Sequence, residues 1–228
     1  MRILHAGLGW VRLLTVAAGA LSLYACASLV GVTDIVGADE GGTASGTFSG
    51  SAFVVNGVGA ATASASNPVN PGYFQVTILL TSYADLCAIP VNSAIPSSQE
   101  LELDIVSSSE ISPGSYDVAF TSWGPNDEIF VDAGSGNFEA PDAFYFAQDQ
   151  NCNTTVEEGA TSGTITITEI DSSQITGSYD LTLAVYDPST GATLAGADHV
   201  TGSFVAPICP SLSQEITEVE DAGTAVCN

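Results

Sequence analysis

Alternating apolar and polar positions are the dominant pattern of the chain after its first 40 residues. Residues 100–105 place three carboxylates on one face of an extended segment and three aliphatic side chains on the other, which predicts a strand with one solvated face. Residues 178–185 alternate in the same way and predict a second, longer strand. Similar runs predict further strands at residues 48–55, 58–64, 74–80, 116–121, 128–133, 138–147, 164–168 and 193–205.

Turn residues separate these runs and favour antiparallel connections. Asn56-Gly57 predicts a two-residue hairpin turn, and Asp171–Gln174 and Pro188–Gly191 predict two further turns. The three C-terminal strands are therefore expected to form a meander. Outside the N-terminus only residues 212–220 suit a helix, and then a single short turn. The pattern predicts an all-β fold of about ten strands in one antiparallel β-barrel or β-sandwich, with a lipocalin/calycin-like barrel as one form of it.

A short motif of a hydroxyl residue, glycine, a second hydroxyl residue and an apolar residue recurs. We interpret it as a strand-entry device, because glycine permits a bulge or a close backbone approach and the following aromatic residue begins the inward face. The alternative is a ligand-binding repeat, although the copies are irregularly spaced. The copies are Ser45–Phe48, Thr176–Tyr179, Thr201–Phe204 and the variant Ser162–Ile165.

The N-terminal residues have the layout of a secretory signal. Arg2 and Arg12 supply a basic region, and an apolar run follows from Leu13 to Leu23. This run is shorter than the roughly 20 apolar residues that a membrane-spanning helix needs. We expect residues 1–25 to be a lipoprotein signal peptide.

The segment Leu23-Tyr24-Ala25-Cys26 resembles the lipobox of bacterial lipoproteins, although Tyr24 stands where that family has a small or branched residue. The resemblance implies that Cys26 is acylated and becomes the mature N-terminus. Ala27 follows it in place of the Asp that signals inner-membrane retention, which implies an outer-membrane address. Several acyl chains anchor a protein firmly, whereas one binds only marginally. Residues 26–42 are then a glycine-containing flexible tether.

The runs Ala160–Ile167 and Thr176–Leu183, with Thr201–Pro207 before Cys209, resemble a group of uncharacterised β-rich lipoproteins of soil-dwelling Gram-negative bacteria. The similarity covers mainly residues 160–210 and more loosely residues 43–87. Its motifs are strand and turn motifs, and the group carries no established activity. The resemblance therefore implies a location and not a function.

Four cysteines remain besides Cys26, and none of them forms a C-x-x-C pair. In an oxidising envelope an even set of this kind predicts two disulfides. Sequence leaves three connectivities open, of which we favour Cys87–Cys209 with Cys152–Cys227. On this reading residues 43–210 form the β domain, and residues 211–228 form an acidic C-terminal tail tied down through Cys227.

The charge balance limits the partners of the mature chain. No Lys or Arg follows Cys26, whereas all 26 acidic residues do, so the formal charge of this part is −26. Nucleic acid is excluded, because binding its phosphates requires cationic side chains. The expected partners are the membrane, through the lipid on Cys26, and a neutral or cationic small ligand, a glycan or a divalent cation. The sequence does not decide the oligomeric state.

Few residues suit catalysis or metal binding. His199 is the only histidine after Cys26, and no Gly-x-Ser-x-Gly elbow is present. Paired carboxylates could hydrolyse glycosides, but close pairs occur by chance among so many acids. Calcium is the one cofactor that the composition suits, with Asp132 and Asn137 as weak candidate ligands in a glycine-rich segment. Asp149, Glu157 and Glu158 form a second acidic cluster with no better claim.

Trp123 is the only tryptophan after Cys26 and lies on a predicted loop, where it would contact a ligand or cap the core. The sequence thus predicts a lipid-anchored envelope protein that acts as a non-catalytic binding or surface-structural module, without a cofactor. The alternative is an envelope hydrolase of the acid-pair glycosidase type.

Overall fold

The computed structural model describes residues 41–66, 72–89, 93–119, 139–185, 197–215 and 226–227. Several predictions concern residues outside these ranges. They are the signal peptide, acylated Cys26, Trp123, the calcium candidates Asp132 and Asn137, the strand at residues 128–133 and the turn at Pro188–Gly191.

Strands make up most of the described residues, which confirms the all-β prediction. The two short helical elements are a 3-10 helix, η1 (Leu86–Ala88), and α2 (Pro210–Glu215). The eleven strands in the described ranges are β1 (Gly41–Ser45), β2 (Gly57–Ala63), β3 (Phe74–Thr81), β4 (Ser93–Ala94), β5 (Gln99–Ser107), β6 (Gly114–Ala119), β7 (Glu139–Gln148), β8 (Thr154–Ile170), β9 (Gln174–Val185), β10 (Asp198–Pro207) and β11 (Val226–Cys227).

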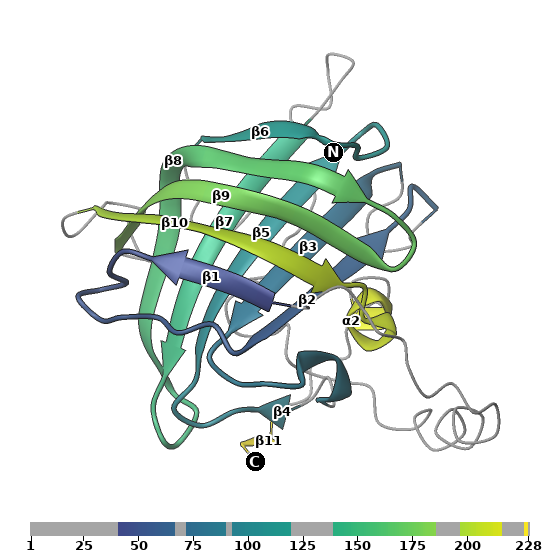
Figure 1. Ribbon diagram of the computed structural model, residues 1–228. Helices are drawn as coiled ribbons and strands as arrows, with labels where there is room; N and C mark the ends of the chain where they lie inside the picture. The colour runs from purple at the N-terminus through teal and green to yellow at the C-terminus, as the bar shows by residue number, and fades with distance from the viewer. Residues whose placement is uncertain are drawn as a thin grey trace, which may run out of the picture.

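Nine of these strands form one antiparallel sheet that curls into a nearly closed barrel. The strand order is β1-β10-β9-β8-β7-β5-β3-β2, and β6 also pairs with β8. In Figure 1, β1, β10, β9 and β8 cross in front of β7, β5, β3 and β2. Between the two ends of this order, the N–H of Cys209, just beyond β10, donates to the carbonyl of Ala60 in β2 at 2.8 Å. The alternative of a β-sandwich is therefore not what the chain forms.

Strand β8 joins the front and the back of the barrel. Its first part pairs with β7 and its second part with β6 on one side, while on the other side β9 pairs with it from Glu158 to Ile170. The register shifts between Ala160 and Ser162, and Gly163 adopts a φ of +141°. A side chain on Gly163 would collide with the backbone of β9, so glycine is required at this bend. The sequence predicted only residues 164–168 of this strand.

The C-terminal meander is confirmed by the pairing of β8 with β9 and of β9 with β10. Asp171 forms the predicted turn between β8 and β9. Its Oδ1 accepts hydrogen bonds from the N–H groups of Ser173 at 2.6 Å and Gln174 at 3.0 Å. These bonds lower the pKa of the Asp171 carboxyl.

The predicted strand at residues 48–55 and the hairpin turn at Asn56-Gly57 are wrong. Residues 48–51 instead form a tight turn, and Gly57 begins β2. Asn56 donates from its backbone N–H to Thr81 and from its side chain to Ser82, each at 2.8 Å. The Asn-Gly pair therefore joins the start of β2 to the end of β3.

Two copies of the recurring glycine motif, those within β9 and β10, act as a cross-strand packing device and not as a strand-entry device, whereas Gly163 of the variant copy lies at a bulge, as the interpretation allowed. The copies in β9 and β10 pair antiparallel, so that Gly202 lies opposite Tyr179 and Gly177 opposite Phe204. A Cβ on Gly177 would lie 2.6 Å from Phe204 Cζ, and one on Gly202 would meet the Tyr179 ring. Each glycine therefore leaves room for the aromatic ring of the other copy. Both rings are buried in the core, which confirms that the aromatic residue of each copy faces inward.

Side chains from both walls fill the barrel interior. The largest fully buried members of this core are Tyr145, Phe48, Phe204, Ile78, Leu80, Leu101, Leu103, Ile105, Ile165, Ile167, Ile175 and Leu181. Leu101, Leu103 and Ile105 occupy the inner face of β5, as the alternation predicted. The opposite face of β5 is not solvated as expected, because Glu102 and Asp104 are only 8% and 7% exposed.

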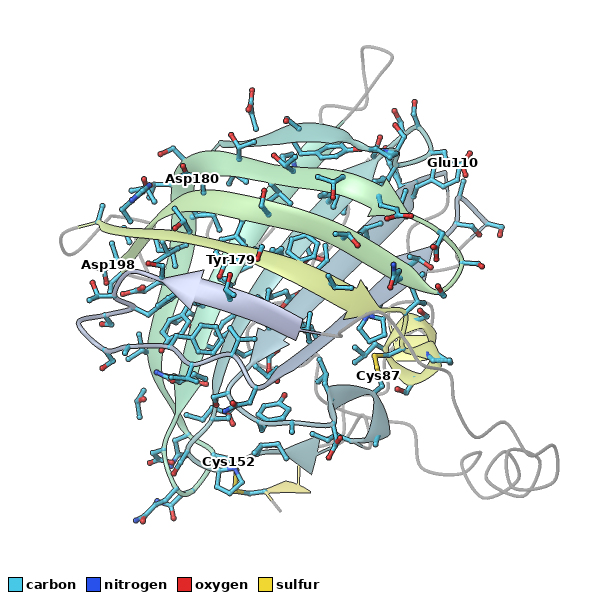
Figure 2. The ribbon with its side chains drawn as sticks, viewed as in Figure 1. Cys87, Glu110, Cys152, Tyr179, Asp180 and Asp198 are labelled. Carbon is cyan, nitrogen blue, oxygen red and sulfur yellow. A yellow bond between two sulfur atoms is a disulfide. The ribbon has the colours of Figure 1, made fainter. Side chains whose placement is uncertain are left out.

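Two disulfides tie the terminal segments to the barrel, and their pairing is the one that we favoured. Cys87 in η1 bonds Cys209 next to α2, and Cys152 bonds Cys227 in β11 (Figure 2). Strand β11 also pairs in parallel with β4. Neither helical element of the described residues has the length and hydropathy of a membrane span.

Candidate functional site

The most unusual polar group among the described residues is the side chain of Glu158, inside one end of the barrel. Glu158 lies in β8 opposite Tyr145 of β7 and Val185 of β9. Tyr145 belongs to the core, and in antiparallel strands directly opposed residues point to the same face. Glu158 therefore points inward with Val156 and Ala160, its neighbours two positions away. Only 2% of its surface is exposed.

The segment between β1 and β2, residues 46–56, packs against this end of the barrel and is called the cover segment below. Phe48 and Ser51 exchange two backbone hydrogen bonds, at 2.8 and 2.9 Å, around Ser49 and Gly50. The φ angles of Ser49 and Gly50, 49° and 76°, are those of a type I′ turn. The tight turn places Ser49, which is itself exposed, within hydrogen-bonding distance of Glu158.

Aromatic side chains fix the cover segment to the barrel. The rings of Phe48 and Phe53 pack edge to face, with centroids 5.2 Å apart. Both contact Tyr145, at centroid distances of 4.8 and 5.9 Å. Such ring geometries are favourable beyond the apolar area that they bury. The cover segment and these rings therefore close the barrel end at which the Glu158 side chain is buried.

Ser49 is the hydrogen-bond donor to Glu158. It donates from its backbone N–H and from its hydroxyl, and both bonds stabilise the ionised carboxylate. The second oxygen, Oε2, is buried and has no hydrogen-bond partner within the described part of the chain. Burial disfavours the charge more strongly than Ser49 favours it, and the nearby Asp198 carboxylate adds repulsion. Together these effects raise the pKa of Glu158 to about 7.

Tyr145 is coupled to the same carboxyl. Its hydroxyl accepts a hydrogen bond from Gln99 Nε2 at 2.8 Å. Burial raises the pKa of the Tyr145 phenol, the bond from Gln99 lowers it, and the negative charge of Glu158 raises it further. The phenol therefore stays protonated when Glu158 ionises.

Two other acids lie at the same end of β9 and β10, as Figure 2 shows for Asp180 and Asp198. Asp198 Oδ1 accepts a hydrogen bond from Thr47 of the cover segment at 3.1 Å. Asp180 Oδ1 lies 2.7 Å from His199 Nε2, but both side chains are about two-thirds exposed. An exposed pair of this kind contributes little to stability. His199 thus lies on the surface, bonded to Asp180.

The chemical capacity of this arrangement is proton exchange. A carboxyl with a pKa near 7 binds or releases a proton within the neutral range, which an ordinary glutamate does not do. In its neutral form it can also donate a hydrogen bond. Glu158 is the described residue best suited to act as an acid, a base or a pH-sensitive contact.

The other predicted acidic positions have structural environments. Asp149 accepts hydrogen bonds from the N–H groups of Asn151 and Asn153, at 2.8 and 2.9 Å, and these bonds lower its pKa. It therefore orders the turn between β7 and β8. Tyr83 donates to Glu100 at 3.2 Å, while burial raises the pKa of Glu100. No group of three or more His, Cys, Asp or Glu side chains within the described ranges is arranged to hold a metal ion.

Sequence reasoning placed Glu158 in an acidic cluster without separating it from its neighbours. The sequence did contain a signal. Val156 and Ala160 stand two positions before and after Glu158, and residues two apart in a strand share a face, so Glu158 belongs to an apolar face. This alternation was missed because the strand was predicted to begin only at residue 164. Ser49 was missed because it fell in a predicted strand.

Comparison with known proteins provides no relative from which the fold or the site could be interpreted. Neither protein-family models nor curated proteins nor solved structures gave a match to this chain.

Proposed function

We propose that this protein is a lipid-anchored component of the bacterial cell envelope, tethered to the outer membrane through acylated Cys26. In this proposal the β-barrel acts as a non-catalytic binding or surface-structural module. Residues 1–25 are removed on export, and the acidic barrel is placed at the membrane on a short tether.

The observation that supports this proposal best is the pairing of the cysteines. Of the five cysteines in the chain, four form the two disulfides, and Cys26 is left over. Structural disulfides persist in oxidising compartments, which supports export from the cytoplasm. An odd cysteine directly after Leu23-Tyr24-Ala25 supports acylation at that position.

The packed interior limits where a ligand would bind. Lipocalin-like barrels bind small molecules in an internal cavity, whereas large side chains fill the core of this barrel. A ligand of this module is therefore expected on the outer wall or at a barrel end. The charge of −26 favours a neutral, cationic or divalent ligand.

Mass spectrometry of the protein isolated from its native membrane tests the anchor. The expected species begins at Cys26 and carries fatty acids. A chain that retains residues 1–25, or one whose processed N-terminus carries no lipid, would contradict the proposal. Cys26→Ser should release the protein from the membrane fraction, whereas Ala27→Ser should leave it anchored.

A melting screen tests the binding role. Calcium, lipids and glycans are added separately, and a ligand of the folded protein raises the melting temperature according to RT ln(1 + [L]/Kd). A shift with one of them identifies a binding module. The absence of a shift with all of them favours the surface-structural role.

A hydrolase is the second candidate, and Glu158 is the observation that favours it. A carboxyl with a pKa near 7 beside a second carboxylate, Asp198, is the combination that an acid-pair glycosidase uses. Hydrolysis of a panel of envelope glycans would support this candidate, provided that Glu158→Gln and Asp198→Asn each abolish it. Activity that persists in both variants would reject these residues.

A further inference from the structure

We propose that the cover segment, residues 46–56, is a pH-dependent closure of one barrel end, in which Glu158 is the proton-binding residue. The protonated carboxyl favours the closed arrangement, and ionisation favours opening. This inference goes beyond the envelope role proposed above, because it concerns a conformational change of the barrel itself.

The contacts of the cover segment are suited to such a change. Its backbone has no continuous ladder with a neighbouring strand in the described pairing, and the Phe48–Ser51 bridge is internal to it. It is attached through the Phe48, Phe53 and Tyr145 rings, through Thr47 on Asp198, through Ser49 on Glu158 and through a 3.4 Å bond from Gln99 to the Ala52 carbonyl. Asn56, at the end of the segment, is held by its bonds to Thr81 and Ser82. Segments with few ladder hydrogen bonds open at lower free energy than the strands around them.

Glu158 is the point at which the closed arrangement is sensitive to protonation. In the closed arrangement only 2% of the surface of Glu158 is exposed, and its Oε2 has no hydrogen-bond partner among the described residues. An ionised carboxylate in this position lacks the hydration that it would have in water, and Ser49 replaces only part of it. Opening the segment gives water access to both oxygens, so the ionised form gains more from opening than the neutral form does.

No neighbouring charge compensates the ionised carboxylate. The titratable groups that face Glu158 are Tyr145 on β7 and Asp198 on β10. The Asp198 carboxylate repels a negative charge there, and the protonated Tyr145 phenol supplies no positive charge to offset it. Strand β9 contributes Val185 opposite Glu158, and the cover segment contributes only the uncharged Ser49 and Thr47. The described ranges contain no Lys or Arg, and His199 bonds Asp180 on the surface.

The direction of the effect follows from proton linkage. The closed state binds the proton with a pKa of about 7, and a solvated carboxyl does so near 4.5. The closed state therefore holds more protons between these values, and the fraction of open molecules rises with pH across this window. The rise is at most about tenfold per pH unit for one proton. Above pH 7 both states are ionised, and the open fraction reaches a plateau.

Hydrogen exchange of the intact protein, followed by mass spectrometry, tests this inference. Exchange of peptides covering residues 46–56 is measured from about pH 5 to about pH 8 and divided by the intrinsic rate at each pH. We expect the normalised opening to rise roughly tenfold or more up to pH 7 and then to level off. Peptides from β9 and β10 should show a much smaller change.

Two variants isolate the carboxyl. Glu158→Gln keeps the shape and an acceptor for Ser49 but cannot ionise, so its cover segment should stay protected at every pH. Glu169→Gln makes the same charge change at an exposed position of the same strand and should behave like the unaltered protein.

Three outcomes would overturn the inference. They are normalised exchange of residues 46–56 that does not vary with pH, a pH dependence that survives Glu158→Gln, and an equal loss of protection along the whole chain. Should Glu158→Gln fold poorly, carbon NMR of the Glu158 carboxyl decides instead. A titration midpoint near 7 supports the proposal, and one near 4.5 rejects it.

Discussion

Single glycines decide how closely β9 and β10 pack. Gly202 lies beneath Tyr179, whose hydroxyl donates to the carbonyl of Thr43 in β1 at 2.9 Å. The ring therefore spans from β9 over β10 to the first strand, and only a residue without a side chain permits this. Burial without a nearby cation keeps the Tyr179 phenol protonated, because desolvation raises its pKa.

We predict that Gly202→Ala destabilises the barrel by about 1–3 kcal/mol, the usual cost of overpacking a filled site. The added methyl group would collide with Tyr179 and with the Thr43 carbonyl. Urea denaturation measures the difference. Gly114→Ala is the control, because its Cβ would meet nothing nearer than 3.8 Å. Equal stability of both variants would contradict the prediction.

We also predict that Glu158 makes the stability of the whole protein depend on pH. The folded carboxyl binds its proton with a pKa of about 7 and the unfolded one near 4.5, so the folded state binds more protons in between. The contribution of Glu158 is thus fully present below pH 4.5 and is lost as the pH rises through 7.

Glu158→Gln removes this loss. The variant should match the original protein near pH 4.5 and exceed it in melting temperature at pH 8. The difference should grow by at most about 1.4 kcal/mol per pH unit between these values. Differential scanning calorimetry at several pH values makes the comparison, and a constant difference would argue against it.

At the scale of elements, strand alternation was the reliable signal and strand boundaries were not. The inner residues of β5 and the meander of β8, β9 and β10 followed from period-two patterns and turn residues. Residues 48–55 alternate too, but Ser49 and Gly50 take positive φ angles that end any strand there. Burial of Glu102 and Asp104 could not be read from the sequence, because alternation does not reveal what covers the outer face.

The site was less predictable than the fold. Its parts come from β7, β8, β10 and the segment after β1, and no local motif joins them. Only the assembled barrel brings the turn at Ser49 over Glu158. Trp123, Asp132 and Asn137 lie outside the described residues and stay predictions.

The cover segment should depend on its buried ring far more than on its exposed apolar residue. Phe48→Ala should cost about 3–5 kcal/mol, because Phe48 is 1% exposed and packs against Phe53 and Tyr145. Val54→Ala lies in the same segment, but 63% of Val54 is exposed, and it should change stability by less than about 0.5 kcal/mol. Similar losses for both variants in thermal denaturation would contradict this assignment.

For the whole molecule, the two disulfides should differ in resistance to reduction. Each bond has one exposed cysteine, Cys87 or Cys227, but their partners differ, because Cys209 is fully buried whereas Cys152 is only half-buried. Thiolate attack depends on access, so limited dithiothreitol should cleave Cys152–Cys227 first. Alkylation and peptide mapping identify the order. Earlier labelling of Cys87 and Cys209 would contradict the prediction.

The pairing of β1 with β10 has a consequence for how the molecule comes into being. Gly41–Ser45 pairs with residues 201–205, and Thr43 and its partner Ser203 lie 160 residues apart, so β1 has no strand partner until β10 has been delivered. Contacts between residues so distant in sequence form slowly, because a long loop must close first. A barrel whose chain emerges gradually from a ribosome or an export channel would thus remain unsealed until β10 arrives.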